Sequence, residues 1–254
     1  MTAPRTTAPD FSGKVAWVTG GAQGFGAGVA TRLASLGAQV VVSDINQDSG
    51  EAVAAEIGGA FVACDVSRLE DCQAAVAAVI ERHGRLDIAF LNAGIATGCT
   101  VGEDFDLALY RRAMGVNLDG VVFGAHAAFA ALKATSGDVV ATASLAGLVG
   151  TGFDPIYGAN KHGVVGLVRA IGEDWVQHGI RVNALCPGFA DTAIVDPLRE
   201  LLSDSGIPLI PVELVVDAFV SAATSGRSGE CWYIQPGRPA EPFRFRGIPG
   251  PRTE

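Results

Sequence analysis

The sequence has no block of basic residues and few positive charges overall. Its 254 residues include 18 Lys and Arg against 27 Asp and Glu, which gives a formal net charge of −9 at pH 7. Nucleic acids and anionic membrane surfaces attract basic patches, so this balance argues against both as partners. No uninterrupted apolar run reaches the ~18 residues of a transmembrane helix. We therefore expect no nucleic-acid partner and no membrane partner.

Cysteine is also scarce, and its placement argues against a metal site. The five cysteines are scattered, no pair has metal-ligand spacing, and Cys64 and Cys186 lie in apolar, strand-like runs. Reduced, buried thiols of this kind are typical of a cytoplasmic protein. Residues 1–10 are rich in Thr, Ala and Pro and lack the apolar core of a secretory signal. We predict that this segment is a disordered lead-in, that the protein is cytoplasmic, and that it holds no metal.

Glycine and apolar residues, by contrast, are abundant. The 33 glycines cluster at the ends of short apolar runs, and the 49% hydrophobic content with 18% charged residues indicates a well-packed globular protein. Apolar runs alternate with helical patterns of ~10–15 residues, which is the pattern of βαβ units and a parallel sheet. Strands are predicted at 14–19, 39–43, 60–64, 86–91, 139–143, 181–185 and 231–235.

The helical patterns between these strands predict an α/β fold with one doubly wound, seven-stranded parallel sheet and helices on both faces. Continuously apolar strands fit a sheet that is covered on both sides. Asn46 and Ser67 are the expected N-caps of two helices. Nothing in the sequence separates two domains. Helices are predicted up to residue 36 and at 46–57, 67–83, 104–133, 155–178, 192–205 and 211–224.

The turn after the first predicted strand contains Gly20, Gly24 and Gly26 and leads into a helix. Glycines allow the backbone to approach a ligand closely, and a helix N-terminus offers unpaired N–H groups to a pyrophosphate. Asp44 ends the next strand, 18 residues after Gly26. A carboxylate there would bind the adenosine ribose hydroxyls and repel a 2′-phosphate, so NAD is favoured over NADP. The alternative role for Asp44 is a helix cap.

A second candidate site follows the strand at 139–143. Ser144 comes directly after this strand, and Tyr157 and Lys161 lie four residues apart on one face of the next helix. An ammonium beside a phenol stabilises the phenolate, which would lower the tyrosine pKa from ~10 and make it a usable base. The alternative is an ordinary surface pair, because so short a motif also occurs by chance.

Together these motifs resemble the short-chain dehydrogenase/reductase family over residues 11–237. The short insert and the tail loosely resemble its hydroxyprostaglandin-dehydrogenase-like branch. The matching residues are Thr19-Gly20-x-x-x-Gly24-x-Gly26, Asp65-Val66, Asn92-Ala93-Gly94, Asn117, Ser144, Tyr157-x-x-x-Lys161, and Pro187-Gly188 with Thr192.

The resemblance implies a single-domain Rossmann fold and an NAD-dependent oxidoreductase that transfers hydride between an alcohol and NAD+. Tyr157 would act as general base, Ser144 would position the substrate oxygen, and Lys161 would hold the nicotinamide ribose and lower the pKa of Tyr157. Asn117 would hold a water that links Lys161 to solvent; its alternative role is a local helix distortion, and that of Ser144 is a turn cap. The cofactor residues implied are Gly20, Gln23, Gly24, Phe25, Gly26, Asp44, Ile45, Asp65, Val66, Asn92, Ala93, Gly94, Tyr157, Lys161, Pro187, Gly188 and Thr192.

The substrate region is expected in the short apolar insert at 189–211, which is followed, after residue 237, by a Pro-rich tail at 238–254. With Ile156, the insert suggests an apolar pocket and an apolar secondary alcohol; alternatively, its apolar residues only pack the insert onto the body. Asp154 would contact substrate or, as we favour, cap the helix ahead of Pro155. The substrate candidates are Ser144, Phe153, Asp154, Tyr157 and Phe189.

Two predicted helices are apolar on more than one face, at 116–129 and 164–171. Such helices are normally buried, so we expect a homodimer or homotetramer through the helices around 104–133 and 155–178; the alternative is a crowded core. The tail is expected to cross onto a neighbouring subunit. Two other functions remain open, a non-catalytic NAD-binding regulator and an NAD-using epimerase or lyase, although a complete proton relay argues against the first.

Overall fold

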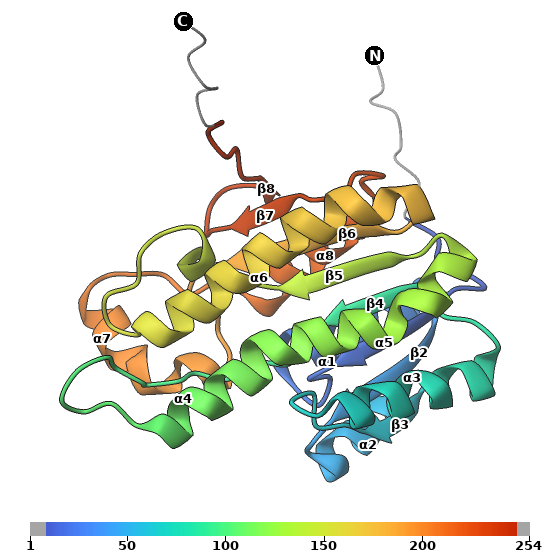
Figure 1. The fold of residues 1–254 in the computed structure, drawn as a ribbon, viewed down its shortest axis with the longest axis horizontal. Coiled ribbons are helices and arrows are strands. Elements are labelled where there is room, and N and C mark those ends of the chain that lie inside the picture. The colour runs from blue at the N-terminus through green and yellow to red at the C-terminus, as the bar shows by residue number, and fades with distance from the viewer. Residues whose placement is uncertain (1–8, 248–254) are drawn as a thin grey trace, which may run out of the picture.

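The computed structural model describes residues 9–247, so most of the predicted lead-in and the end of the tail lie outside the described residues. One sheet runs through the molecule in the order β3-β2-β1-β4-β5-β6-β7-β8, and its first seven strands are parallel (Figure 1). The predicted doubly wound α/β fold is confirmed. The strands are β1 Val15–Thr19, β2 Gln39–Asp44, β3 Ala60–Ala63, β4 Ile88–Leu91, β5 Asp138–Thr142, β6 Arg181–Pro187, β7 Cys231–Ile234 and β8 Glu241–Pro242.

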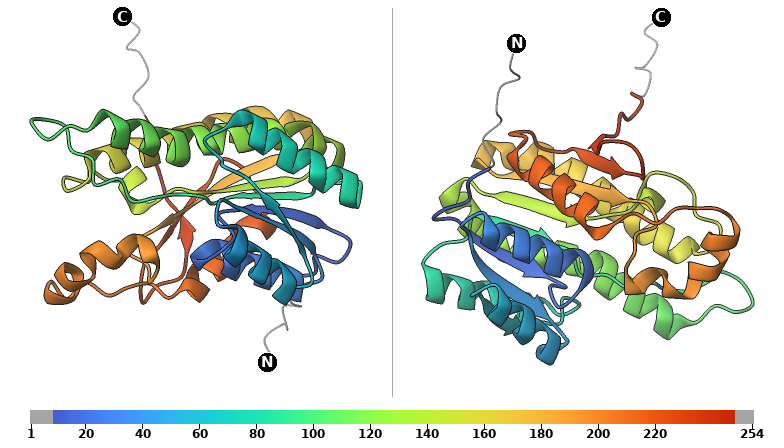
Figure 2. Two further views of the ribbon diagram at one scale, coloured as in Figure 1. Left: turned by 90° about the horizontal axis from the view of Figure 1, so that it is seen from below. Right: turned by 180° about the vertical axis from the view of Figure 1, so that it is seen from behind.

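Helices cover both faces of the sheet. One face packs against α1, α2 and α8, and the other packs against α3, α5 and α6. The view from below in Figure 2 shows the two helix layers on either side of the sheet. The helices are α1 Gly24–Ser35, α2 Gln47–Glu56, α3 Leu69–His83, α4 Leu107–Met114, α5 Gly120–Thr135, α6 Pro155–Asp174, α7 Arg199–Asp204 and α8 Val212–Thr224. Shorter helical turns lie at Gly115–Asp119, Leu145–Gly147, Trp175–His178 and Ala193–Leu198.

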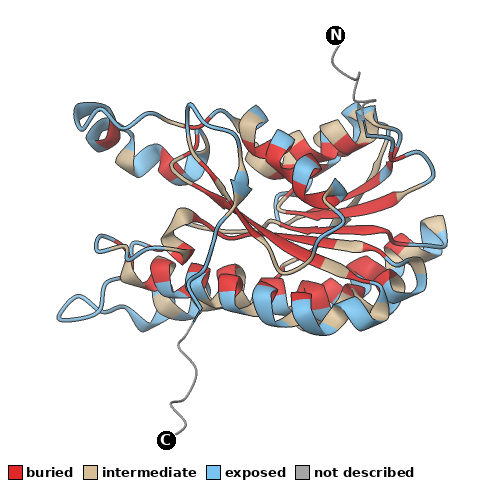
Figure 3. Ribbon diagram, turned by 90° about the horizontal axis from the view of Figure 1, so that it is seen from above, coloured by how far each residue is buried: buried red, intermediate tan, exposed pale blue. Residues whose placement is uncertain are grey.

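The central strands are buried because they face a helix layer on each side. In β1, Val15 and Trp17 join one apolar cluster, while Ala16 and Val18 join the other. Figure 3 shows the same arrangement, with buried residues in the strands and on the helix sides that face them. A strand buried on both faces must be apolar at every position, which explains the continuous apolar runs of the sequence.

The long helix predicted at 104–133 is present as one helix, Leu107–Thr135, with a π-helical turn inside it. Asp106 caps α4 by accepting from the amides of Ala108 and Leu109, and a π-helical turn at Gly115–Asp119 then separates α4 from α5. By length and composition alone, Leu107–Thr135 would suffice to span a membrane. A core helix of a globular domain has the same properties, and this one packs against α3, α6 and β4.

Of the two predicted N-caps, one is confirmed and one is wrong. The Asn46 side chain accepts from the amide of Ser49, at 3.2 Å, and caps α2. Ser67 does not cap α3, whose N-cap residue is Arg68. The Ser67 hydroxyl instead donates to Asp65, at 2.7 Å, because that carboxylate lies two residues back in the same turn.

The tail contributes an eighth strand that the sequence pattern did not predict. β8 pairs antiparallel with β7 of its own chain, through Trp232 with Pro242 and Tyr233 with Glu241. Farther along, the ring of Phe245 lies 3.9 Å from the Arg169 guanidinium of α6. As far as residue 247, the tail therefore packs against its own subunit. That it also crosses to a neighbouring subunit stays a prediction.

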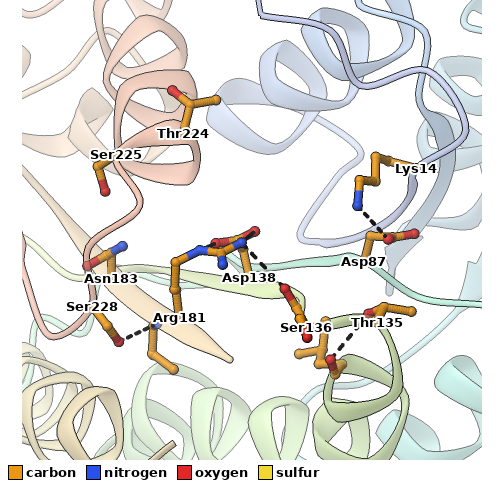
Figure 4. Close-up of polar contacts among 12 residues, drawn as sticks. Lys14, Asp87, Thr135, Ser136, Asp138, Arg181, Asn183, Thr224, Ser225 and Ser228 are labelled. Atoms are coloured by element: carbon orange, nitrogen blue, oxygen red, sulfur yellow. Dashed lines mark hydrogen bonds and ion pairs between the residues drawn. The ribbon is translucent and has the colours of Figure 1, made fainter. Parts of the chain in front are cut away.

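Ion pairs fasten the strand ends that lie opposite the glycine-rich turn. The buried Asp87 carboxylate, ahead of β4, accepts from Lys14 at 3.0 Å and from Arg85 at 2.7 Å. Arg181 of β6 forms a two-pronged contact with Asp138 of β5, at 2.7 and 2.6 Å (Figure 4). These contacts hold β1, β4, β5 and β6 at one end and so help to set how the strands align at the other.

Candidate active site

The carboxyl ends of the parallel strands open into a cleft of about 1150 Å³. Open α/β sheets bind ligands at this edge. Of the predicted site residues, only Gly26 and Asn117 do not line the cleft. Those that do are Gly20, Gln23, Gly24, Phe25, Asp44, Ile45, Asp65, Val66, Asn92, Ala93, Gly94, Ser144, Phe153, Asp154, Tyr157, Lys161, Pro187, Gly188, Phe189 and Thr192.

The glycine-rich turn has the geometry that a pyrophosphate requires. Gly20 and Gly24 adopt φ of 61° and 54°, where other residues are strained. A Cβ on Gly26 would lie 2.0 Å from the carbonyl oxygen of Gly20, so Gly26 supports the turn from behind. Gln23, the N-cap of α1, makes no side-chain cap, and the first turn carries no acidic residue. The free N–H groups of α1 therefore fit a dinucleotide phosphate.

Asp44 lies at the end of β2 and lines the cleft next to the glycine-rich turn. Its two oxygens accept from the amides of Ala22, at 3.0 Å, and Asn46, at 2.9 Å. Because Asn46 caps the following helix, the alternative of Asp44 as a helix cap is wrong. Its hydrogen bonds fix the carboxylate between the glycine-rich turn and the start of α2. Asp44 can therefore present oxygen acceptors to a ligand in the cleft.

Asn92 joins three of the strand ends that form the cleft floor. Its side-chain amide donates to the carbonyl oxygens of Thr19 and Gly20, at 3.2 and 3.1 Å. Its side-chain oxygen accepts from the Thr142 hydroxyl at 2.9 Å. Asn92 thus links the ends of β1, β4 and β5.

Lys161 lies one turn after Tyr157 in α6, in the interior of the cleft floor. Its Nζ donates to the carbonyl oxygen of Thr142 at 2.8 Å and lies 5.6 Å from the centroid of the Tyr157 ring. The side chain is 3% exposed, and burial lowers the pKa of Lys161 to about 8. Lys161 is therefore a cation at neutral pH that loses its charge at a lower pH than an exposed lysine.

The phenol of Tyr157 is governed by burial rather than by Lys161. Burial raises its pKa above the ordinary value, a hydrogen bond with Ser144 lowers it, and Asp154 and Cys186 raise it further. Lys161 is not among the groups that shift this pKa, and its Nζ donates to the carbonyl oxygen of Thr142. That Lys161 lowers the pKa of Tyr157 stays a prediction. In this structure, the Ser144 hydroxyl is the group that favours the phenolate.

Ser144 combines the two roles that the sequence left open. Its hydroxyl accepts from the amide of Ala146 at 3.1 Å, so it caps the helical turn Leu145–Gly147. The same hydroxyl lowers the pKa of Tyr157 and donates to the carbonyl oxygen of Pro187 at 3.4 Å. The cap therefore fixes Ser144 beside the phenol.

Asn117 occupies the π-helical turn and is fully buried, so the local helix distortion is present. Its side chain forms two hydrogen bonds with the backbone of Ile95, at 2.8 and 3.0 Å, and donates to Asn160 at 3.3 Å. A Cβ on Gly94 would lie 3.3 Å from Asn117 Oδ1 and 3.7 Å from Lys161 Nζ. The absence of a side chain at Gly94 therefore leaves space between these two polar groups.

The apolar residues of the insert divide between the cleft and the core. The rings of Phe153 and Phe189 lie 6.1 Å apart at the cleft wall. Ile210 is buried in the core, and Leu202 is also buried and does not line the cleft. Ile156 was expected at the pocket but packs away from it, because the first turn of α6 directs it into a separate apolar cluster. From the insert itself, the apolar residues at the cleft are Phe189, Ala190, Ala193, Ile194, Val195 and Leu198.

Asp154 caps α6, as the sequence suggested, by accepting from the amide of Tyr157 at 2.9 Å. It also accepts from the Thr97 hydroxyl and from the amides of Thr97 and Gly98, at 3.3 and 3.1 Å. Both carboxylate oxygens are thus engaged within the protein, which leaves Asp154 poorly suited to bind substrate. Sequence analysis missed Thr97 and Gly98, because they lie more than fifty positions from Asp154 and carry no motif.

Comparison with known protein families covers most of the residues that form the cleft. The model of the short chain dehydrogenases matches residues 14–202, which is well over half of the chain. The chain belongs to the short-chain dehydrogenase family. Members of this family are oxidoreductases that use a nicotinamide cofactor. This protein is therefore an oxidoreductase of alcohols and ketones with such a cofactor.

Two relatives of this short-chain dehydrogenase are, by their names, dehydrogenases of ring alcohols. It is 40% identical over 202 residues to 2,5-dichloro-2,5-cyclohexadiene-1,4-diol dehydrogenase of Sphingobium indicum, covering 78% of this chain and 80% of that protein. It is 38% identical over 196 residues to cyclohexanol dehydrogenase of an Acinetobacter species, covering 75% and 78% of the two chains. A solved 3-ketoacyl-(acyl-carrier-protein) reductase of Brucella melitensis, complexed with NADH, is 29% identical with a TM-score of 0.84, covering 90% and 99%.

Two further features concern metal-ligating side chains and thiols. Among residues 9–247, no group of three or more His, Cys, Asp or Glu is placed to hold a metal ion. All five cysteines of the short-chain dehydrogenase are buried, free thiols.

Proposed function

We propose that this short-chain dehydrogenase oxidises an apolar, cyclic secondary alcohol to the ketone with NAD. One observation carries the proposal: Ser144, Tyr157 and Lys161 line one cleft together with the glycine-rich turn and the Asp44 carboxylate. A site that held a cofactor without catalysis would not need a hydroxyl beside a buried phenol. The cleft therefore favours a dehydrogenase over a non-catalytic NAD-binding regulator.

The residues of the chain divide the work as follows. Ser144 holds the substrate oxygen beside Tyr157, and Tyr157 removes the hydroxyl proton as general base. Lys161 contributes a buried cation on the cofactor side, where a ribose hydroxyl would replace water around it. Asn117 is proposed to hold a water for the proton's exit, next to the space left by Gly94. Bound NAD would accept the hydride from the carbinol carbon.

The preference for NAD rests on charge at the adenosine end. Asp44 lines the cleft there, and among residues 9–247 the only basic side chains that line any part of the cleft are Arg112 and Lys161. Lys161 lies beside Tyr157, away from Asp44. A 2′-phosphate near Asp44 would meet a carboxylate without a neighbouring cation from the glycine-rich turn, which disfavours NADP.

The substrate class rests on the apolar wall opposite Tyr157. Phe153 and Phe189 form a tilted pair at the cleft, and Val149, Ile194 and Leu198 extend the wall. A ring of carbon atoms would bury apolar area against these side chains, whereas a charged or strongly polar substrate would lose hydration without compensation. The names of two relatives, the cyclohexadiene-diol dehydrogenase and the cyclohexanol dehydrogenase, agree with a ring alcohol.

A panel of cyclic, linear and terpenoid secondary alcohols, assayed by NADH absorbance, tests the proposal. We expect turnover with cyclic secondary alcohols and stoichiometric NADH. NAD binding with no NADH from any alcohol would point to the regulator. Isomerised or eliminated product without net NADH would point to an epimerase or lyase.

We also propose that the protein is a cytoplasmic homodimer or homotetramer. A groove of about 310 Å³ lies between α5 and α6, the two helices expected at the interface. Val122 and Val176, on these helices or at their end, are exposed large apolar side chains. Sedimentation at micromolar concentration tests this assembly, and a clean monomer contradicts it. The groove residues are Val122, Ala125, His126, Phe129, Leu167, Ile171 and Trp175.

A further inference from the structure

Asp154 is a buried carboxylate with an unusual set of partners. The residue is 8% exposed, and no ion pair between it and a Lys, Arg or His occurs in residues 9–247. Its charge is stabilised by three backbone N–H groups and one hydroxyl, at the N-terminus of the helix that carries Tyr157. A buried charge needs such partners, so each of them is held firmly in place.

A simple N-cap uses only one oxygen, and Asp154 uses two. Oδ1 accepts from the amide of Tyr157 and from the Thr97 hydroxyl, while Oδ2 accepts from the amides of Thr97 and Gly98. The second oxygen thus serves the loop after β4 and does nothing for α6. Capping alone does not account for this arrangement.

The same loop is fastened again two residues earlier. Ile95 exchanges two hydrogen bonds with the side chain of Asn117, at 2.8 and 3.0 Å. The segment 95–98 is therefore held at one end by Asn117 and at the other by Asp154. It forms a short tie between the π-helical turn and the first turn of α6.

An apolar contact also joins the end of segment 95–98 to α6. Cys99, which follows the segment, and Ile156, which follows Asp154, pack together with Ala113 of α4, and all three are buried. Thr97 itself is 8% exposed. The loop, α4 and α6 thus meet at a small buried apolar cluster, next to the hydrogen bonds of Asp154.

We propose that Asp154 is a positioning residue of the dehydrogenase, whose carboxylate ties segment 95–98 to the first turn of α6 and so holds Tyr157 in register with Asn117. This inference rests on the function proposed above. Asp154 acts through Tyr157 and need not touch substrate or cofactor.

The charge of Asp154 has a second consequence for Tyr157. The groups that face the phenol are Lys161 of the same helix, Ser144 after β5, Cys186 of β6, and Asp154. Of these, Asp154 carries the negative charge, and it raises the pKa of Tyr157. Replacing the carboxylate with a neutral group lowers that pKa, so the acid limb of alcohol oxidation moves to lower pH.

Asp154→Asn tests both consequences in the full-length protein. Asparagine still caps α6, but its NH2 group meets the amides of Thr97 and Gly98, donor against donor. We expect kcat to fall roughly 10- to 100-fold, as misplacement of a catalytic group does, with little change in the KM for NAD. The acid limb of the pH–rate profile for alcohol oxidation shifts to lower pH. Hydrogen exchange of the backbone amides becomes faster in peptides that cover residues 95–100.

Thr97→Val separates the tie from the charge. It removes the hydroxyl that donates to Asp154 but keeps the carboxylate, so kcat falls without a shift of the acid limb. Thr97→Ser restores the hydroxyl and should recover most of the activity. Asp106→Asn is the matched control, because Asp106 caps α4 and is exposed; it should leave kcat and the pH profile unchanged.

The outcomes are separable. An active wild type whose Asp154→Asn variant keeps the same kcat, acid limb and exchange overturns the positioning role and leaves a plain helix cap. A wild type that oxidises no alcohol overturns the proposed function. In that case, unchanged exchange at 95–100 in Asp154→Asn would also show that the tie itself is absent.

Discussion

The Nζ atom of Lys161 lies 2.8 Å from the carbonyl oxygen of Thr142, at the carboxyl end of β5. The ammonium is buried, and among residues 9–247 no carboxylate pairs with it. A single neutral acceptor compensates poorly for lost hydration, and the pKa of Lys161 falls to about 8 as a result. The catalytic helix is thus destabilised at the position where it needs a cation.

Lys161→Met should therefore stabilise the protein near neutral pH while it abolishes activity. The pKa of Lys161 in the folded protein, about 8, lies below the ordinary lysine value of 10.5. Below pH 8 both states are protonated and the folded state bears the full cost of the buried charge. Between these values the unfolded state binds more protons, so the wild type becomes more stable as pH rises.

The size of this effect follows from the same two values. A pKa lowered from 10.5 to about 8 corresponds to roughly 3 kcal/mol, at ~1.4 kcal/mol per pH unit. The lost hydrogen bond to Thr142 offsets part of it. Urea unfolding of both proteins at pH 7 and above pH 10, without cofactor, measures the difference. An advantage of the variant that does not shrink at high pH would contradict this account.

Tyr157→Phe should remove the proton acceptor and leave the cofactor site intact. We expect kcat to fall roughly 100- to 10,000-fold, the range that general acid–base groups contribute. The Kd for NAD, measured by calorimetry, should change little. Tyr233→Phe is the control, since Tyr233 contacts Glu241 at the sheet edge and does not line the cleft. Substantial activity in Tyr157→Phe would rule out Tyr157 as the base.

Asp44→Asn should weaken the discrimination against NADP. The amide removes the charge that repels a 2′-phosphate and also weakens binding of the ribose hydroxyls, so the ratio of kcat/KM for NADP to that for NAD should rise roughly 10-fold or more. Asp48→Asn removes the same charge from the first turn of α2 but outside the cleft, so its ratio should stay near that of the wild type. A wild type equally efficient with both cofactors would refute the assignment to NAD.

Gly26→Ala should disrupt NAD binding through the shape of the turn. Its Cβ would lie 2.0 Å from the carbonyl oxygen of Gly20, so the backbone of the turn must move. We expect the Kd for NAD to rise more than ~10-fold and the free energy of unfolding to fall by roughly 2 kcal/mol. Ala27→Gly is the control: it weakens α1 by up to ~1 kcal/mol but introduces no clash. Equal NAD affinities in the two variants would argue against a turn-shape effect.

Several structural features could be predicted because they depend on neighbouring positions in the chain. The glycine-rich turn and the Tyr157–Lys161 spacing each arise from residues a few positions apart, and Asp44 ends the strand that follows the turn. Alternating apolar runs and helical patterns predicted the sheet. The π-helical turn at Asn117 was harder to predict, because the apolar pattern of the helix continues through it. The side chain of Asn117 forms hydrogen bonds with the backbone of Ile95, which lies 22 positions away. β8 was missed since its pairing with β7 crosses a turn without periodicity.

By itself, then, the sequence determined the order of the elements and the edge of the sheet where ligands bind, because local spacing and strand order decide these. Most of the residues expected at that edge were implied by the family resemblance. Only the tertiary structure decided the electrostatics and the ties of the site. Burial raises the pKa of Tyr157 and lowers that of Lys161, and Thr97 meets Asp154 from far along the chain. These properties depend on which atoms exclude water and which distant segments touch, and neither leaves a pattern among adjacent residues.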